Sequence, residues 1–202
     1  EILYIIRPGV DGLLQMLSWS NLTRFWSTMS IATLPKAVPN TIVAQRTVNE
    51  AVWIAYRLKD SGRVQVAKYS DGVWRSVKRS KYKAGADPAI EVTAEQVNVL
   101  FPRHDLVVIH LTTHSESKTE LKTKATMAIL RIGSRVLAVF QNAFTTGLDY
   151  SVFNGVWLAP QSTSQNIDAL STPILMKVDE GGNDIVVAWV IDGRVRVMNG
   201  RR

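Results

Sequence analysis

Short apolar segments with an alternating pattern recur along this chain. Five of them begin at Ile2, Val52, Val97, Val136 and Ile185, so their starts lie roughly 40 to 50 residues apart. Each is followed by a turn and a second strand-like segment. One such unit cannot bury its own apolar face, so each unit must pack against its neighbours. The repeat therefore predicts an all-β fold, a β-propeller of about five blades.

Each full copy divides into four short antiparallel strands, and the copies together form a single domain over residues 1–202. The domain can also belong to a longer chain. The first copy lacks an opening strand, and the last copy ends after its third. We expect the first and last copies to join and close the ring. The predicted blades lie near residues 1–36, 37–83, 84–124, 125–165 and 166–202.

A turn signal repeats in phase with these strands. Asp71-Gly72-Val73-Trp74 and Asn154-Gly155-Val156-Trp157 stand at the same place in two copies. Asp-Gly and Asn-Gly supply the positive φ angles that a tight hairpin needs. The sequence thus predicts the same local structure at both places, between the third and fourth strands.

Aromatic residues flank this turn in three copies. Trp19, Tyr69 and Phe153 precede it, and Trp26, Trp74 and Trp157 follow it. A partly exposed ring at a repeated turn offers a flat apolar face, which suits the CH face of a sugar. The alternative is that these rings pack blade against blade. Trp53 and Trp189 lie on second strands, where we expect them in the core.

The order of strand, hairpin, Asp-Gly and Trp resembles the β-propeller lectins of fungi and bacteria that bind fucose or related sugars. In that family each site uses an Arg on the second strand, a Glu on the third strand and Trp residues around an Asp-Gly turn. Here Arg57 ends a second strand, and no Glu stands at the matching place on the third strands. The resemblance implies a carbohydrate-binding, lectin-like module with shallow repeated sites between blades.

We therefore expect glycans or glycoconjugates as partners. Aromatic rings would lie under the sugar, and Arg, Gln or Asn side chains would hydrogen-bond to it. The candidate ligand-binding residues are Trp74, Trp157, Trp26, Tyr69, Arg57, Gln65 and Asn154.

Signals for catalysis are weak, so an enzyme is the less favoured class. The chain has no cysteine, which excludes a thiolate nucleophile and a cysteine-ligated metal. His110 and His114 lie on a predicted strand about 13 Å apart, too far for one metal, and we expect both at surface or hairpin positions. No Gly-rich phosphate loop occurs. The sequence predicts no catalytic residue, no metal and no cofactor.

Two other classes stay open. A propeller glycoside hydrolase needs two carboxyl groups across the scissile bond. The predicted innermost strands offer Glu91, with Asp179 and Glu180 at a strand end. An acid that caps a strand end is the alternative interpretation. The other class is a protein-interaction or structural propeller of a virus or toxin.

The chain is basic, with a formal net charge of +7. A cluster of positive residues is predicted on an outer strand: Arg75, Lys78, Arg79, Lys81 and Lys83. It predicts either attraction to an anionic partner or protection of an edge strand from aggregation. No apolar run approaches the roughly 18 residues of a membrane span. A secreted or extracellular location is slightly favoured, and the oligomeric state stays open.

Overall fold

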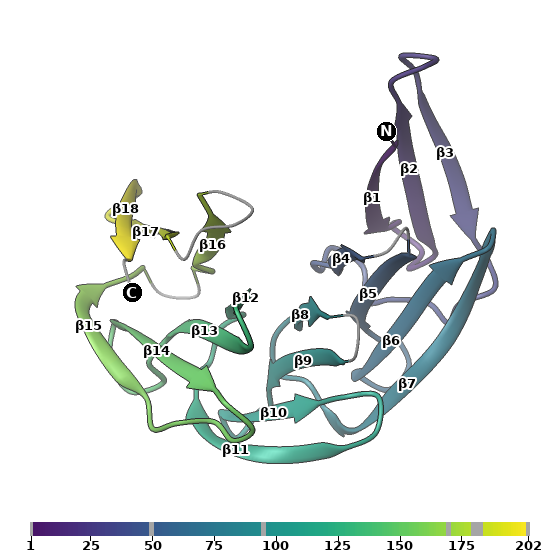
Figure 1. Cartoon of the computed structure of the whole chain (residues 1–202). Coiled ribbons are helices and arrows are strands. Elements are labelled where there is room, and N and C mark those ends of the chain that lie inside the picture. The colour runs from purple at the N-terminus through teal and green to yellow at the C-terminus, as the bar shows by residue number, and fades with distance from the viewer. Residues whose placement is uncertain (1, 49–50, 94–95, 169–170, 179–183, 201–202) are drawn as a thin grey trace.

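The structure is a computed structural model that describes residues 2–48, 51–93, 96–168, 171–178 and 184–200. Every regular element among these residues is a β-strand, and the strands form five antiparallel sheets. The sheets follow one another around a common axis (Figure 1). This arrangement confirms the predicted all-β propeller of five blades.

The strands of each blade follow in chain order. The first blade contains β1 (Ile2–Pro8), β2 (Leu14–Ser20) and β3 (Trp26–Ile31). The second contains β4 (Ala44–Val48), β5 (Ala51–Arg57), β6 (Arg63–Ser70) and β7 (Val73–Lys83). The third contains β8 (Ala89–Val92), β9 (Val97–Pro102), β10 (Val107–Leu111) and β11 (Glu116–Lys122). The fourth contains β12 (Ala128–Ile132), β13 (Arg135–Gln141), β14 (Gly147–Phe153) and β15 (Gln161–Asn166). The fifth contains β16 (Ile174–Lys177), β17 (Ile185–Ile191) and β18 (Arg194–Gly200).

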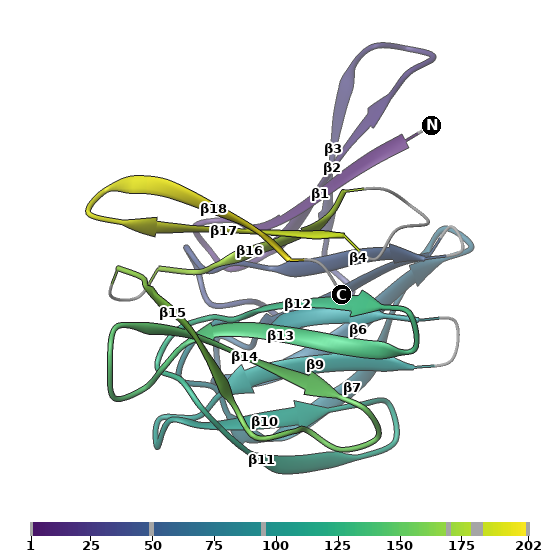
Figure 2. The same ribbon diagram turned by 60° about the vertical axis from the view of Figure 1, so that its left-hand side comes forward.

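In the part of the chain that the structure describes, the middle three blades have four strands each, and the first and last have three. The innermost strands touch in series, β4 against β8, β8 against β12 and β12 against β16. Among the described residues, the first and last blades do not join in one sheet, and the blades form an open arc (Figure 1). The expected closure of the ring is therefore wrong. The β2–β3 hairpin of the first blade extends away from the other sheets (Figures 1 and 2).

Alternation along the second strands explains how the blades pack. On β5, Ile54 and Tyr56 belong to a cluster shared with the first blade, whereas Ala55 belongs to the cluster shared with the third. On β13, Ala138 faces the third blade and Val139 faces the fifth. Successive side chains point to opposite faces of a strand. A strand buried on both faces therefore reads as a continuous apolar run, which is the pattern that recurs in the sequence.

Four apolar clusters result, one between each pair of consecutive blades. No described residue covers the outer faces of the two terminal blades. Leu3 and Ile5 of β1 are exposed there, as are Val195 and Val197 of β18. Trp189 is buried in the last cluster, and Trp53 is half-buried against the second one, so both contribute to the packing between blades, as predicted.

The two expected Asx-Gly hairpins differ in their backbone. Asp71 and Gly72 have φ angles of 54° and 77°, the pair of positive values that a tight two-residue turn requires. In the fourth blade Gly155 has a φ of 81°, and Asn154 is not among the residues with positive φ. Trp74 pairs with Tyr69, but Trp157 bridges to Phe153 across a turn that is one residue shorter. The prediction of one shared local structure is therefore wrong.

Candidate functional site

A shallow pocket lies between the third and fourth blades. Its volume is about 480 Å³. The third blade supplies one wall from β10, β11, their connection and the residue before β9, and the fourth blade supplies the other from the end of β14 and the connection that follows it. The residues that line it are Gln96, His110, Thr112, Ser115, Ser117, Lys118, Thr119, Glu120, Phe153, Gly155, Val156 and Trp157.

Three rings form the aromatic wall of this pocket. The rings of Phe153 and Trp157 lie 5.3 Å apart between centroids. The His110 ring stands edge-on to both, at 4.9 Å from Phe153 and 5.7 Å from Trp157. Phe153 and Trp157 also pack against the cluster between the third and fourth blades. The short turn through Gly155 brings the two rings together, and the core beneath them holds them in place.

His110 is 5% exposed, so its predicted surface or hairpin position is wrong. His114 is exposed at the turn after β10, as predicted. Burial lowers the pKa of His110 to about 4, because removal from water penalises the charged ring. The neutral ring donates through Nε2 to Oδ1 of Asn98 at 2.9 Å. Nδ1 is then the acceptor nitrogen of this ring.

The rest of the rim is polar. The hydroxyls of Thr112 and Ser115 lie 2.9 Å apart, and Oγ1 of Thr119 donates to the Val108 carbonyl at 3.0 Å. Lys118 and Glu120 also line the pocket, and Nζ of Lys118 lies over the ring of Tyr82, 5.9 Å from its centroid. The pocket thus combines an apolar ring face with hydroxyl and charged groups around it.

Trp157 presents its ring to the pocket rather than its N–H. The residue is half-buried, and its Nε1 is buried without an acceptor among the described residues. Asn154 lies exposed on the same turn but does not line the pocket. Of the candidate ligand-binding residues, the structure therefore brings Trp157 into this pocket.

Trp74 occupies the matching place in the second blade but is 7% exposed. Its ring lies 5.2 Å from Tyr69, and Tyr69 lies 6.4 Å from Tyr4 of the first blade. All three rings belong to, or pack against, the cluster between the first two blades. The expectation of a partly exposed ring at Trp74 is wrong, because the first blade covers it.

Trp26 is 48% exposed and lies 5.7 Å from Trp19. Trp19 pairs with Leu3, whereas Tyr69 pairs with Val52. Leu3 is the residue after the repeat start and Val52 is the repeat start itself. The pairing of Trp19 is therefore shifted by one residue relative to that of Tyr69. Because successive side chains point to opposite faces, this shift places Trp19 and Trp26 on the opposite face of their sheet. That is the outer face of the first blade.

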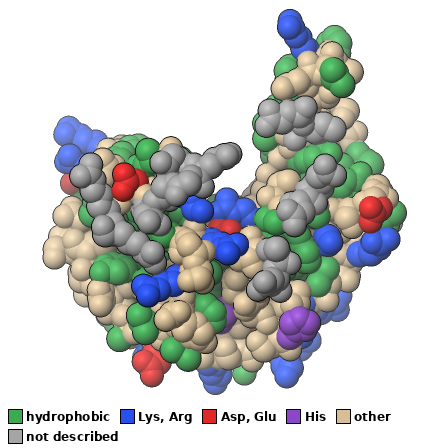
Figure 3. Space-filling view, viewed as in Figure 1, with side chains coloured by type: hydrophobic (Ala, Val, Ile, Leu, Met, Phe, Trp, Pro, Cys, Tyr) green, Lys and Arg blue, Asp and Glu red, His purple; other side chains and the backbone are tan. Residues whose placement is uncertain are grey.

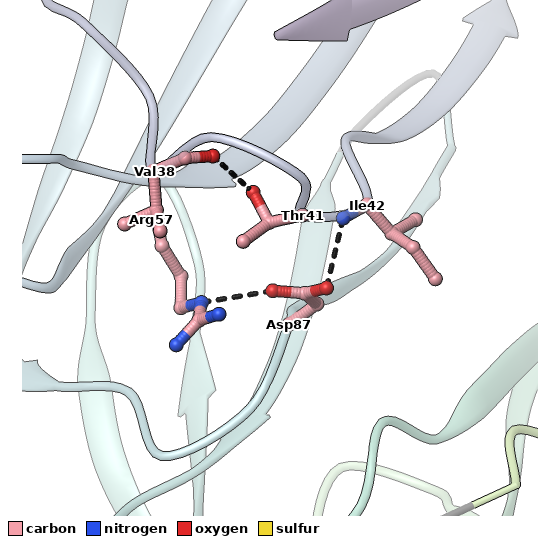
Figure 4. A network of polar contacts seen from close by, with 5 residues as sticks. All are labelled: Val38, Thr41, Ile42, Arg57 and Asp87. Atoms are coloured by element: carbon pink, nitrogen blue, oxygen red, sulfur yellow. Dashed lines mark hydrogen bonds and ion pairs between the residues drawn. The ribbon is translucent and has the colours of Figure 1, made fainter. Parts of the chain in front are cut away.

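Arg57 is held in a polar network that ties the second blade to the third (Figure 4). Its Nε lies 2.8 Å from Oδ1 of Asp87. The other oxygen of Asp87 accepts from the Ile42 N–H at 2.8 Å, and the Thr41 hydroxyl donates to the Val38 carbonyl at 2.7 Å. These contacts give Arg57 a structural role, because they hold the second blade against the third.

Gln65 is buried at the irregular pairing of β6 with β7. Its Nε2 donates to the carbonyls of Val66 and Lys78 at 2.8 and 3.0 Å. Its Oε1 accepts from Nε of Arg79 at 3.3 Å. Both the Nε2 and the Oε1 of Gln65 are therefore bonded within its own blade, so Gln65 also has a structural role.

Apart from Glu120, the acids that could serve a hydrolase lie outside this pocket. Glu91 on β8 is paired with Arg46 of β4, and Asp149 on β14 accepts from Nδ2 of Asn142 at 2.7 Å. Asp179 and Glu180 fall outside the described residues. No group of three or more His, Cys, Asp or Glu side chains among the described residues could hold a metal ion.

The basic cluster lies on β7, the edge strand of the second blade. Arg75, Arg79, Lys81 and Lys83 are exposed, and Lys78 is half-buried. This location fits edge protection and attraction of an anionic partner equally well. In the described part of the chain, no helix is long and apolar enough to span a membrane.

No family model and no curated protein matches this sequence. Solved structures share its fold. AofleA from Arthrobotrys oligospora is 10% identical with a TM-score of 0.71, over 100% of this chain and 66% of that one. The NanB sialidase from Streptococcus pneumoniae is 11% identical with a TM-score of 0.60, over 88% of this chain and 32% of that one. An exo-β-1,3-galactanase from Clostridium thermocellum is 9% identical with a TM-score of 0.57, over 93% and 51%.

These similarities define the class of the chain as a β-propeller. At such identities they show the fold alone, and the same fold can serve unrelated functions. The chain spans less than two thirds of the length of each of these three proteins.

Proposed function

We propose that this chain is a carbohydrate-binding, lectin-like module that holds a sugar against Trp157, in the pocket between the third and fourth blades. The observation that carries the proposal is the pairing of an aromatic wall with a rim of hydroxyls in one shallow pocket. A pyranose ring has an apolar CH face and a polar edge, so it can contact both surfaces at once. The volume, about 480 Å³, is within the usual range of about 300–1,000 Å³ for ligand pockets.

Each lining group has a distinct role in this proposal. The ring of Trp157 stacks on the sugar, and the hydroxyl of Ser117 and the carboxylate of Glu120 hydrogen-bond to its edge. His110 is a positioning residue, because its bond to Asn98 fixes the edge of its ring against Trp157. Two of the structural neighbours, a sialidase and a galactanase, are enzymes named for sugars, which agrees with a carbohydrate ligand.

The proposal is limited to one principal site. The first blade covers Tyr69 and Trp74. Neither ring can therefore contact a sugar unless the first blade moves away. Binding at a single shallow pocket lacks the avidity that several linked sites provide. We expect weak binding of a monosaccharide and stronger binding of an oligosaccharide that also contacts the rim.

Hydrolysis is the less favoured function for this pocket. It requires two carboxyl groups that flank the bond to be cleaved. Glu120 is the single acid among the described residues that line the pocket. A site with one acid and an aromatic wall is better suited to binding than to cleavage.

The experiment is a glycan array followed by titration of the best sugar into the wild-type chain and three variants. Trp157→Ala should weaken binding about fivefold or more, since stacking contributes about 1 kcal/mol. Trp157→Phe keeps an aromatic face and should retain most of the affinity. Trp26→Ala removes an exposed ring outside the pocket and is the matched control. Equal binding by wild type and Trp157→Ala, both folded, would refute the proposal.

A further inference from the structure

The innermost strands form a second and larger pocket at the axis of the propeller. Its volume is about 850 Å³, and β4, β8, β12 and β16 all contribute to it. Three of these strands place a positive side chain there, namely Arg46, Arg131 and Lys177, and β8 contributes Glu91. Figure 3 shows Lys and Arg side chains gathered at the middle of this face, next to an acidic one.

Glu91, the single acid among the described residues that line this pocket, is already neutralised. Glu91 is 7% exposed at its side chain, and its Oε2 accepts from Nε and Nη2 of Arg46 at 3.1 and 2.5 Å. A buried carboxylate needs such a partner, because burial without one costs several kcal/mol. The pair therefore contributes little net charge to the pocket.

The two remaining cations are not compensated in this way. Neither Arg131 nor Lys177 forms an ion pair with another described residue. Nε of Arg131 donates to the Gly133 carbonyl at 2.7 Å, which orients the guanidinium and leaves its Nη atoms for another acceptor. Both side chains are exposed, so an incoming anion can reach them. The pocket has a positive potential without an internal counter-charge among the described residues.

The other groups that line the pocket indicate what kind of molecule carries the anionic group. Thr47 adds a hydroxyl, and Leu130, Leu175 and Met176 add apolar surface. A bare inorganic anion gains nothing from apolar walls and fills a small part of such a volume. A sugar that carries a carboxylate uses the cations, the hydroxyl and the apolar surface together.

We propose that this axial pocket binds a carboxylate-bearing monosaccharide, with Arg131 and Lys177 on the carboxylate. The site is separate from the pocket at Trp157 and does not depend on the function proposed there. Arg46 and Glu91 form the floor that holds the neighbouring strands β4 and β8 together.

The test is calorimetric titration of the whole chain with sodium glucuronate, glucose and sodium sulfate, at low and at physiological salt. Glucuronate should bind, and its affinity should fall with salt because the attraction is between exposed charges. Arg131→Ala and Lys177→Ala should each weaken glucuronate binding at least fivefold. Arg135→Ala removes an equal charge from an exposed position outside the pocket and should change nothing. Trp157→Ala should also leave glucuronate binding unchanged, which separates this site from the other pocket.

Glu91→Gln provides a test in the opposite direction. The amide can still accept from Arg46, but the negative charge is gone, so glucuronate should bind more tightly. Absence of glucuronate binding, or the same affinity in Arg131→Ala as in the wild type, would overturn the proposal. Sulfate binding as tight as glucuronate would overturn the sugar part of it, and weaker binding in Glu91→Gln would overturn the electrostatic argument. Thermal unfolding of each variant confirms that the protein titrated is folded.

Discussion

Acid should destabilise this protein through His110. The pKa of the folded residue is lowered to about 4 from the ordinary 6.5, because the ring is buried beside Phe153 and Trp157. The unfolded chain therefore takes up a proton below about pH 6.5, whereas the folded chain stays neutral there until about pH 4. Stability falls as the pH decreases through that window and levels off below it. A shift of this size corresponds to about 3 kcal/mol in the free energy of unfolding.

The assay is urea denaturation between neutral pH and about pH 4, for the wild type and for His110→Gln. Glutamine does not titrate and can still donate to Oδ1 of Asn98, so the variant should lose about 3 kcal/mol less than the wild type over this range. His114→Gln changes an exposed histidine and should follow the wild type. Carboxylates elsewhere affect all three proteins alike. Parallel curves for the wild type and His110→Gln would refute the reasoning.

Three further predictions concern other parts of the fold. Trp74→Ala should lower the free energy of unfolding by about 3 kcal/mol or more in urea denaturation, because the ring fills the core between the first two blades; a loss below 1 kcal/mol would contradict that position. Arg57→Ala should cost about 1–3 kcal/mol in the same assay, since it leaves Asp87 without its ion-pair partner, and Asp87→Asn in the Arg57→Ala background should recover part of the loss. If β7 binds an anionic polymer such as heparin, retention on a heparin column should fall steeply with salt; retention that does not depend on salt would leave edge protection as its role.

The sequence predicts the fold well because the determining pattern is local. Val52 and Val136 each open a run that is apolar at every position, and such a run requires neighbours on both faces. The open arc was not predictable in this way. Whether the first and last blades meet depends on how the twist of each sheet accumulates around the axis, and no single segment encodes that sum.

The candidate site shows where sequence patterns reach their limit. Trp74 and Trp157 follow the same kind of turn, yet one is buried and the other lines a pocket. The difference comes from the neighbouring blade. Tyr4 packs against Tyr69, the partner of Trp74, whereas His110 stands beside Trp157. Burial of this kind depends on residues far away in sequence.

The burial of His110 and Gln65 is predictable from the sequence. Each is one polar residue inside an apolar run, between Ile109 and Leu111 and between Val64 and Val66. Such a residue is buried with its neighbours and must find a hydrogen-bond partner. The run predicts the burial, but the partner depends on cross-strand register and needs the structure.

The most direct test of the central claim is an NMR titration of the assigned backbone amides with the best sugar from the glycan array. A sugar held against Trp157 should shift the signals of residues 110–120 and 153–157, which come from the two walls of the pocket. The signals of residues 69–74, at the covered place in the second blade, should stay unchanged. Shifts confined to another surface, or no shifts with a sugar that the array identifies, would contradict a carbohydrate site between the third and fourth blades.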